Sequence, residues 1–468
     1  MKRRSPLLIS DSTALQSAEE LVAMVCEGGA LHADAIVIAK SGDSISVRNG
    51  EVESVEREES CSIGLRAFVE SGSALASATA STADISLSGL KRLAQQVIAM
   101  ARIAEADPDA VPPIGADHPS YTELRAWQRA HDLCDSGWSV ERAREAALNC
   151  EAAALTYDEA ISSSEGAEAG FGSSHVSYLS SDGFAASYSR SSASLSVAVI
   201  AGRGSAMQRD YAWHRALHAS DLRDPIALGQ EAARRAVRRC APRSMRSGET
   251  TVLFEPRTAT SLLAHLSAAV NGRAILQQRS FLADSLGEQL FPDTVCIDDL
   301  PDHPQGLGNR LFDGEGTRCS ANKLVDNGVL RCFLTDRYAA NRLQQAATGS
   351  AKRGLTGDIA IGAANLVWQP GEMSQQEMIA EIGNGFLVTE LIGFGINGVT
   401  GDYSRGAGGL LIENGEVTSA VQGVTIAGNL KQMFSSISHV GRDLTWFGSS
   451  AAPTVAITGM MVAGQESG

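Results

Sequence analysis

The recurrence of Asn-Gly between extended runs of residues is the feature that most constrains how this chain of 468 residues can fold. Asn and Gly both accept a positive φ, so the dipeptide favours the type I′ turn that closes a two-stranded hairpin. Asn49, Asn327 and Asn414 each precede a glycine and stand between such runs. Three more asparagines, Asn271, Asn384 and Asn397, are also succeeded by glycine. The pattern predicts much antiparallel sheet.

A serine-rich stretch over residues 161–205 supports this prediction. Serine richness is compatible with disorder, but here apolar and aromatic residues alternate with the serines at every second position. A period of two places one set of side chains on each face of a strand. The sequence SSDGF (180–184) supplies a turn, and Ser71-Gly72 supplies another earlier in the chain. We therefore expect hairpins in both regions.

Helical spacing of apolar residues appears between these strands. The segments with this spacing are residues 15–27, 85–104, 221–240 and 257–270, with a further helix starting after Ser139. Asp84 or Ser86 can cap the second of them, because a side-chain oxygen there satisfies a free backbone N–H of the first turn. The sequence therefore predicts an α+β fold.

Two stretches mark candidate domain boundaries. Residues 105–120 are rich in Pro and Asp, and residues 241–249 carry a Pro, a Gly and several polar residues. We expect an N-terminal α+β subdomain over 1–115 and a central α+β subdomain over 116–240. Residues 241–468 are expected to form a C-terminal domain dominated by antiparallel β-sheet.

Charge and composition exclude several classes of protein. The formal net charge is −15, which repels a phosphate backbone and argues against nucleic-acid binding. The eight cysteines form no C-x-x-C pair and have irregular spacing, so we expect reduced thiols rather than a disulfide scaffold. No segment reaches the roughly 18 apolar residues of a membrane span, and the apolar run near the first residue is too short for a signal peptide. The chain is expected to be cytoplasmic.

The histidines do not compose a metal site. His214 and His218 have the spacing of a zincin helix, but Arg215 stands where the general-base glutamate should be, and two surface histidines in a loop or short helix are the favoured interpretation. His265 lies in an apolar helix, and its neighbours on the C-terminal side, from Leu266 to Val270, offer no ligand. No G-x-S-x-G elbow or phosphate-binding loop is present either.

The segment over residues 399–430 is the most distinctive. Asp402, Tyr403, Ser404 and Arg405 group four polar side chains beside a glycine-rich run. Two interpretations stay open. The segment is either a charged turn before a strand, or a binding loop whose glycines let a ligand backbone approach closely.

With this segment the sequence resembles the TldD/PmbA family, and within it the PmbA (TldE) branch. The resemblance covers nearly the whole chain and is strongest from about residue 250 onward. The stretches that carry it, in family order, are SSDGFAASYSRSSASLSVAVIA, QRDYAW, SLLAHLSAAVNGRAI, QRSFLADSLGEQLFPD, GLGNRLFDGEGT, LVDNGVL, VTELIGFGINGVTGDYSRGAGGLLIENGE and VTIAGNLKQMF.

The resemblance implies a chain without catalytic residues. TldD carries zinc on an H-E-x-x-x-H helix with a cysteine near the C-terminus as third ligand. Here the first histidine is His265, the glutamate position is Leu266 and the second histidine position is Val270, and residues 446–464 contain no cysteine. A zinc site needs about three protein ligands, so we expect no cofactor in this chain and zinc in a TldD-type partner.

The resemblance also implies partners and substrates. A heterodimer with a TldD-type metallopeptidase subunit would cleave unfolded or flexible peptides, in antibiotic-precursor maturation or antitoxin degradation. When that partner is absent, the chain is expected to be able to form a homodimer. Residues 402–405 are the candidate peptide contacts. Two alternatives remain: a hydrolase acting alone through an unrecognised nucleophile, or a non-proteolytic interaction protein, consistent with the older family label "modulator of DNA gyrase".

Overall fold

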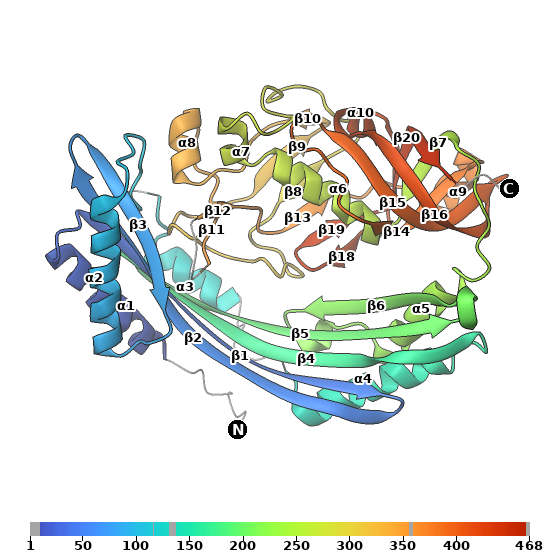
Figure 1. Cartoon of the computed structure of the whole chain (residues 1–468), viewed down its shortest axis with the longest axis horizontal. Coiled ribbons are helices and arrows are strands. Elements are labelled where there is room, and N and C mark those ends of the chain that lie inside the picture. The colour runs from blue at the N-terminus through green and yellow to red at the C-terminus, as the bar shows by residue number, and fades with distance from the viewer. Residues whose placement is uncertain (1–9, 116, 131–136, 355–358, 465–468) are drawn as a thin grey trace.

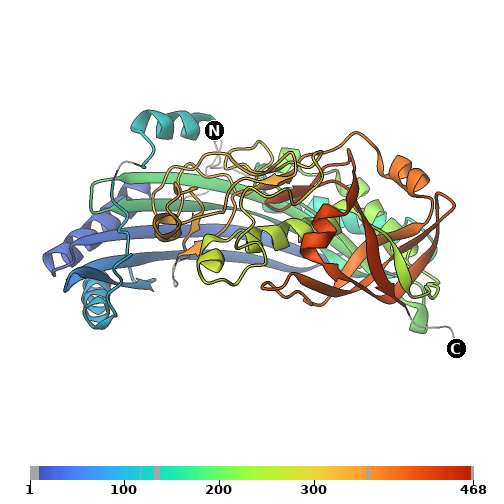
Figure 2. The same ribbon diagram turned by 90° about the horizontal axis from the view of Figure 1, so that it is seen from above.

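The computed structural model describes residues 10–115, 117–130, 137–354 and 359–464. A long six-stranded sheet arches beneath a C-terminal domain, and its strands run side by side along the longest dimension of the molecule (Figures 1 and 2). The sheet is antiparallel throughout, in the order β3-β2-β1-β4-β5-β6. Its strands are β1 (His32–Arg48), β2 (Glu51–Ser71), β3 (Ala74–Thr82), β4 (Ile161–Ser180), β5 (Ala185–Ala201) and β6 (Gln208–Ala216). Because β1 pairs with both β2 and β4, the sheet runs across the boundary expected near residue 115.

Alternation along these strands gives the sheet two different faces. On the outer, convex face, aliphatic residues such as Ile45 and Leu195 are buried beneath helices. The inner face carries the intervening serines and glycines. The covering helices are α1 (Asp11–Glu27), α2 (Leu87–Ile103), α4 (Val140–Leu155) and α5 (Pro225–Val237). Ser10, Ser86 and Ser139 cap the first three of them, each by accepting a backbone N–H. The serine-rich stretch is therefore sheet, as its period of two predicts.

The C-terminal domain contains two further six-stranded sheets around helix α6 (Pro256–Ala269). The first has the order β16-β15-β14-β7-β20-β17, and the second β10-β9-β8-β13-β19-β18. Antiparallel pairs dominate, but β14 pairs with β7 and β13 with β19 in parallel. The largest buried cluster fills the space between these sheets and α6. The predicted α+β class is confirmed.

The bounds of the remaining elements complete the description. The C-terminal strands are β7 (Gly248–Phe254), β8 (Ile297–Asp299), β9 (Asn322–Asp326), β10 (Val329–Leu330), β11 (Ala351–Lys352), β12 (Ala360–Ile361), β13 (Leu366–Trp368), β14 (Gly385–Ile392), β15 (Asp402–Glu413), β16 (Glu416–Asn429), β17 (Ile437–Val440), β18 (Thr445–Phe447), β19 (Ser450–Ala452) and β20 (Val455–Ala463). The other helices are α3 (Tyr121–Ala130), α7 (Gly272–Leu276), α8 (Arg337–Leu343), α9 (Gln375–Ile382) and α10 (Leu430–Ser435).

Three of the Asn-Gly pairs form the expected turns. Asn49, Asn327 and Asn414 have φ of 53°, 48° and 53°, and the glycine after each also has positive φ. Each pair joins two neighbouring antiparallel strands. Asn271 instead caps α7, because its side chain accepts the backbone N–H groups of the first turn. The same dipeptide thus serves as a hairpin turn where a strand comes next and as a helix cap where a helix comes next.

Other observations concern the thiols and the helices. All seven described cysteines are unpaired, and Cys134 lies outside the described residues. Helix α3 was not predicted from the sequence, because it is short and mostly polar and buries little besides Trp127. Across the part of the chain that the structure describes, no helix combines the length and apolarity needed to cross a membrane.

A buried network of charges joins the sheet to the C-terminal domain. Asp34 of β1 accepts from Arg66 of β2 at 2.8 Å and from Arg353 of the C-terminal domain at 2.7 Å. Arg66 also donates to Glu315 at 3.0 Å, and Tyr178 donates to Asp34 at 3.0 Å. Burial alone would raise the pKa of Asp34, but the charges of Arg353 and Arg66 outweigh it and lower the pKa below its ordinary value. Asp34 is therefore held as a carboxylate.

A second ionic junction ties β6 and α5 to β7, α6 and β14. Asp210 of β6 contacts Arg257 at 3.1 Å and Arg239 at 3.4 Å, and Arg239 also pairs with Glu390. Arg238 donates to Glu255 at 2.8 Å. The sheet is thus attached to the C-terminal domain at two places far apart along its strands.

We expect Arg353→Ala to destabilise the protein by about 3 kcal/mol, because it leaves Asp34 buried with only one counter-charge. Urea unfolding monitored by circular dichroism measures the change. Arg92→Ala is the control, since Arg92 and Asp84 form a pair with side chains 67% and 43% exposed, and it should cost less than about 1 kcal/mol. Equal effects of the two substitutions would contradict a structural role for the junction.

Candidate functional site

Helix α6 carries the histidine that the sequence singled out. Pro256 occupies its first turn, where the missing N–H has no partner to lose. Its buried residues, among them Leu262 and Leu266, pack into the main C-terminal core. His265 lies beside this apolar stripe and is only partly buried. The helix is therefore held by packing, and it presents one imidazole at the edge of the core.

Strand β15 brings two of the four candidate polar residues to that imidazole. Side chains alternate along a strand, so Tyr403 and Arg405 share one face, while Asp402 and Ser404 occupy the other. Tyr403 is 1% exposed, and its ring lies 6.0 Å from that of His265 in an edge-on arrangement. Asp402 and Ser404 are exposed. The structure thus unites His265, Tyr403 and Arg405, which the sequence could present only as separate features.

The charge state of this cluster is set by burial and by Arg405. Burial, together with the charge of Arg405, lowers the pKa of His265 to about 4. Burial raises the pKa of Tyr403, although Arg405 opposes the shift. His265 Nε2, Tyr403 Oη and Arg405 Nε are buried and have no hydrogen-bond partner among the described residues. At neutral pH the cluster is a neutral imidazole and a neutral phenol beside a guanidinium cation.

This donor set does not fit zinc. Leu266 and Val270 are 1% and 0% exposed and belong to the core. Neither has an electron pair to donate, and the positive charge of Arg405 repels a divalent cation. Nowhere in residues 10–115, 117–130, 137–354 and 359–464 do three or more His, Cys, Asp or Glu side chains gather in a way that could hold a metal ion.

The other histidine pair is placed differently from the expectation. His214 lies on strand β6, not in a loop or short helix, and His218 comes just after that strand. Partial burial lowers the pKa of His214, with Arg223 adding to the effect. Because residues four apart on a strand are separated by roughly 13 Å, the helical spacing has no chemical meaning here.

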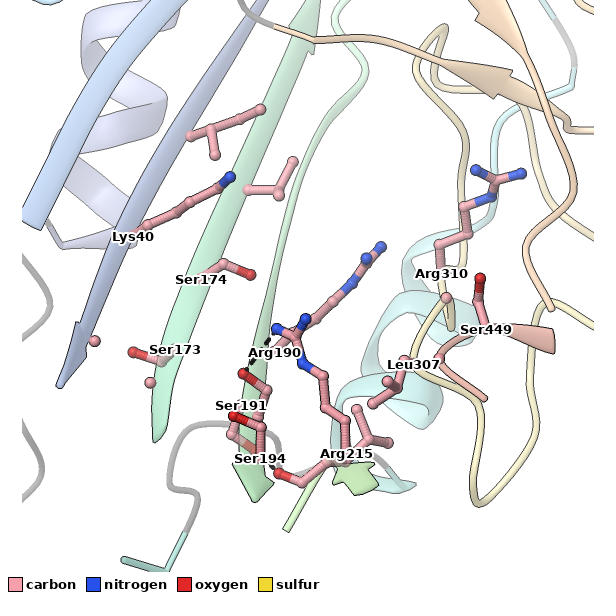
Figure 3. Close-up of a pocket in the computed structure, with 18 of the residues that line it drawn as sticks. Lys40, Ser173, Ser174, Arg190, Ser191, Ser194, Arg215, Leu307, Arg310 and Ser449 are labelled. Carbon is pink, nitrogen blue, oxygen red and sulfur yellow. Dashed lines mark hydrogen bonds between the residues drawn. The ribbon is translucent and has the colours of Figure 1, made fainter. Parts of the chain in front are cut away.

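A cleft of about 1160 Å³ separates the inner face of the sheet from the C-terminal domain. Its floor consists of rows of residues paired across the strands: Lys40, Ser174 and Arg190 form one row across β1, β4 and β5. Two rows further on, Ser44 and Ser194 flank a glycine. The roof comes from loops of the C-terminal domain, including the turn between β18 and β19 (Figure 3).

Sequence reasoning missed this cleft, although the signal was present. Serines and glycines at alternate positions of the long strands indicate strands, and they are also the residues that keep the inner face free of bulky groups. None of the four polar residues over 402–405 lines this cavity. They lie elsewhere in the C-terminal domain, where Ser404 N donates to the carbonyl of Gly395.

Comparison with known protein families matches three segments of the chain. Three family models match it: the PmbA/TldA metallopeptidase domain 1 over residues 33–101, the central domain over 135–239 and the C-terminal domain over 247–464. Together they describe a subunit of the metallopeptidase class.

Relatives along the whole chain define the family. The chain is 33% identical to "Metalloprotease PmbA" of Escherichia coli O157:H7, covering 97% of this chain and 96% of that protein. It is 31% identical to "Metalloprotease PmbA homolog" of Haemophilus influenzae, covering 97% and 99%. The chain therefore belongs to the PmbA/TldD family.

Solved structures share the fold. A Bacteroides thetaiotaomicron protein described as a modulator of DNA gyrase superposes with a TM-score of 0.84 at 25% identity, covering 98% of this chain and 100% of that one. TldE from Thermococcus kodakarensis superposes with a TM-score of 0.84 at 21% identity, covering 96% and 100%. The arched sheet and the C-terminal domain are thus a shared architecture.

The electrostatics of α6 can be measured by NMR. We expect the His265 imidazole to titrate near pH 4, and Arg405→Gln to raise its pKa only partly towards 6.5, because burial is the larger cause. Since the folded pKa is the lower one, the contribution of His265 to stability is complete above the unfolded pKa and is lost as pH falls from about 6.5 to about 4. Arg442→Gln, far along the chain on an exposed turn, is the control. An ordinary pKa for His265 would contradict this account.

Proposed function

We propose that this chain is the PmbA/TldE-type subunit of a two-component cytoplasmic metallopeptidase, without a zinc site of its own. The observation that carries the proposal is the composition of α6 and its surroundings. One imidazole is present, the remaining donor positions are the buried aliphatic residues Leu266 and Val270, and Arg405 places a cation beside them. A water molecule cannot be deprotonated there by a metal or by a carboxylate base. The zinc and its chemistry then belong to a TldD-type partner.

The contribution of this chain would be to hold an unfolded or flexible peptide. The cleft floor is rich in hydroxyl groups, which hydrogen-bond a peptide without demanding particular side chains. Strands β6 and β18 are each the last of their sheets and approach each other at the cleft, where Trp213 contacts Phe447 with ring centroids 5.8 Å apart. An unpaired strand edge can accept an extended peptide through main-chain hydrogen bonds, with little sequence preference. Precursor peptides and antitoxins are substrates of this kind.

An exposed apolar segment supports the proposed pairing with a second subunit. Ile392 at the end of β14 and Phe394 and Val399 in the connection to β15 are 53%, 96% and 54% exposed. Large exposed apolar groups that lie together mark interaction surfaces. Asp402 and Ser404 lie on the adjoining start of β15, where Asp402 O accepts from Asn397 N. We place the partner subunit on this segment. Asp402 and Ser404 are exposed beside it and stay candidate contacts for a peptide at the interface with the partner, outside the cleft. Tyr403 and Arg405 face the other side of β15, where Tyr403 is buried.

The test of the missing zinc site is metal content. We expect the purified chain to carry no stoichiometric zinc by mass spectrometry, because its own donors are insufficient. Co-expression with a TldD-type protein should give a complex with zinc, and zinc should stay with the partner when the two chains are separated. One zinc per chain in the protein expressed alone, and lost on His265→Gln, would overturn the proposal.

The test of the pairing surface is Phe394→Asp. We expect this substitution to weaken assembly with the TldD-type partner at least tenfold, because it puts a charge where an apolar ring would be buried. Size-exclusion chromatography with light scattering measures assembly. Ile103→Asp is the matched control, since Ile103 is 86% exposed at the end of α2, and it should assemble normally. Normal assembly of the Phe394 variant would place the interface elsewhere.

A further inference from the structure

The cleft contains cations without acidic partners. Lys40 and Arg190 project from the same row of the sheet floor towards the C-terminal loops (Figure 3). Lys352 lines the cleft from the C-terminal side. None of these three forms an ion pair with a described carboxylate, whereas the arginines of both domain junctions do. These three side chains therefore bring positive charge to the middle of the cleft without an ion pair to the described carboxylates.

Arg190 is held in position by an aromatic neighbour. Its guanidinium lies over the Tyr188 ring at 4.9 Å from the centroid and donates to Tyr188 Oη at 3.0 Å. Tyr188 in turn packs against Phe312 of the C-terminal domain, with ring centroids 5.3 Å apart. Arg190 Nε is buried and has no hydrogen-bond partner in the described part of the chain. The group is ordered by packing and keeps donor capacity for a ligand.

The opposite wall adds charge instead of cancelling it. Arg310 is 7% exposed, and its guanidinium donates to the carbonyls of Gly349 and Gly362 at 3.3 Å and 3.0 Å. The carboxyl of Asp313 interacts with Arg310. Burial raises the pKa of Asp313 to about 7, and the charge of Glu315 is the second cause. The same carboxyl already accepts the backbone N–H groups of Glu315, Thr317 and Ala351.

Floor and wall are close enough to interact. Partial burial lowers the pKa of Lys352, and the charges of Arg310 and Arg190 lower it further, while the charge of Asp299 opposes them. The acidic residues of the floor lie to one side of Lys40. Glu58 pairs with Gly42, two residues along β1, and Glu56 pairs with Ser44, four residues along, which is roughly 13 Å at the rise of a strand. The cleft thus has a basic centre and an acidic end.

We propose that Lys40, Arg190 and Lys352 form a carboxylate-binding site that selects peptides with an acidic group, either a free C-terminus or an Asp or Glu side chain. This inference rests on the proposed peptide-holding function and narrows its substrate class. A carboxylate fits because Arg and Lys donors on two walls surround it with charge-assisted hydrogen bonds. A nucleic acid fits poorly, because the acidic end of the cleft and the net charge of −15 repel a polyanion.

The experiment measures peptide binding to the full chain by fluorescence anisotropy. Four labelled peptides share one neutral, flexible interior and end in Glu-Glu or Gln-Gln, each as free acid and as amide. We expect the peptide with most carboxylates to bind about tenfold more tightly than the neutral amide, and added salt to reduce the difference. Comparison of the Gln-Gln free acid with the Glu-Glu amide assigns the preference to the terminus or to the side chains.

Charge-neutral variants locate the site. Arg190→Gln and Lys352→Gln should each remove most of the preference, and Arg190→Lys should retain part of it. Lys91→Gln on the exposed side of α2 makes the same change in net charge and should leave the preference intact. Circular dichroism confirms folding of each variant. If Arg190→Gln fails to fold, Lys352→Gln decides the test, and an unchanged preference in the folded Lys352→Gln variant overturns the site.

The outcomes separate the two proposals. Equal binding of acidic and neutral peptides overturns the carboxylate site and leaves peptide holding intact. Binding of none of the four peptides overturns both. Displacement of the acidic peptide by a short single-stranded oligonucleotide, with the same dependence on Arg190, would assign the site to phosphate and overturn the proposal.

Discussion

The buried ionic junction around Asp34 fixes where the sheet stands relative to the C-terminal domain, and the rest of the molecule depends on it. Charges removed from water are costly unless each finds its partners, so Asp34, Arg66, Glu315 and Arg353 tolerate one arrangement only. The second junction at Asp210 does the same at a distant point. The cleft lies between these two attachments, and its polar floor of serines and glycines offers little apolar surface that could close it.

Strand alternation gives the arch its two faces and explains how much of the fold could be read from the sequence. Turn residues with positive φ and a period of two are local properties, and they predicted the hairpins and the strands correctly. The junctions are not local, because Arg353 and Asp34 are 319 residues apart. No pattern in the sequence indicates which of many arginines will be buried beside which aspartate. Helix α3 was missed for a different reason, since it has too few apolar residues to give a helical pattern in the sequence.

The candidate site was predictable in its parts but not as a whole. His265 and the segment from Asp402 were singled out separately, and alternation along β15 alone could have divided that segment into an inward pair and an outward pair. Only the structure shows that Tyr403 and Arg405 lie beside His265. Burial at this place, with the charge of Arg405, shifts the pKa values of the imidazole and the phenol. The cleft was missed because serine in a strand does not by itself indicate a binding site. Its contribution here is its small size, which leaves space above the inner face of the sheet.

The aliphatic residues Leu266 and Val270 of α6, at the positions where the resemblance to TldD would place a glutamate and a histidine, contribute to packing. Leu266 and Val270 extend the apolar stripe of the helix into the largest core of the molecule, where a glutamate and a histidine would each need a charge or a hydrogen bond to be satisfied. A carboxylate at position 266 would now be buried among aliphatic groups, without the third ligand that a described metal site would require. Restoring metal chemistry would therefore require several coordinated changes, and every single step would weaken the core. In the proposed pairing with a TldD-type subunit, this cost would keep the metal chemistry in the partner and the packed core in this chain.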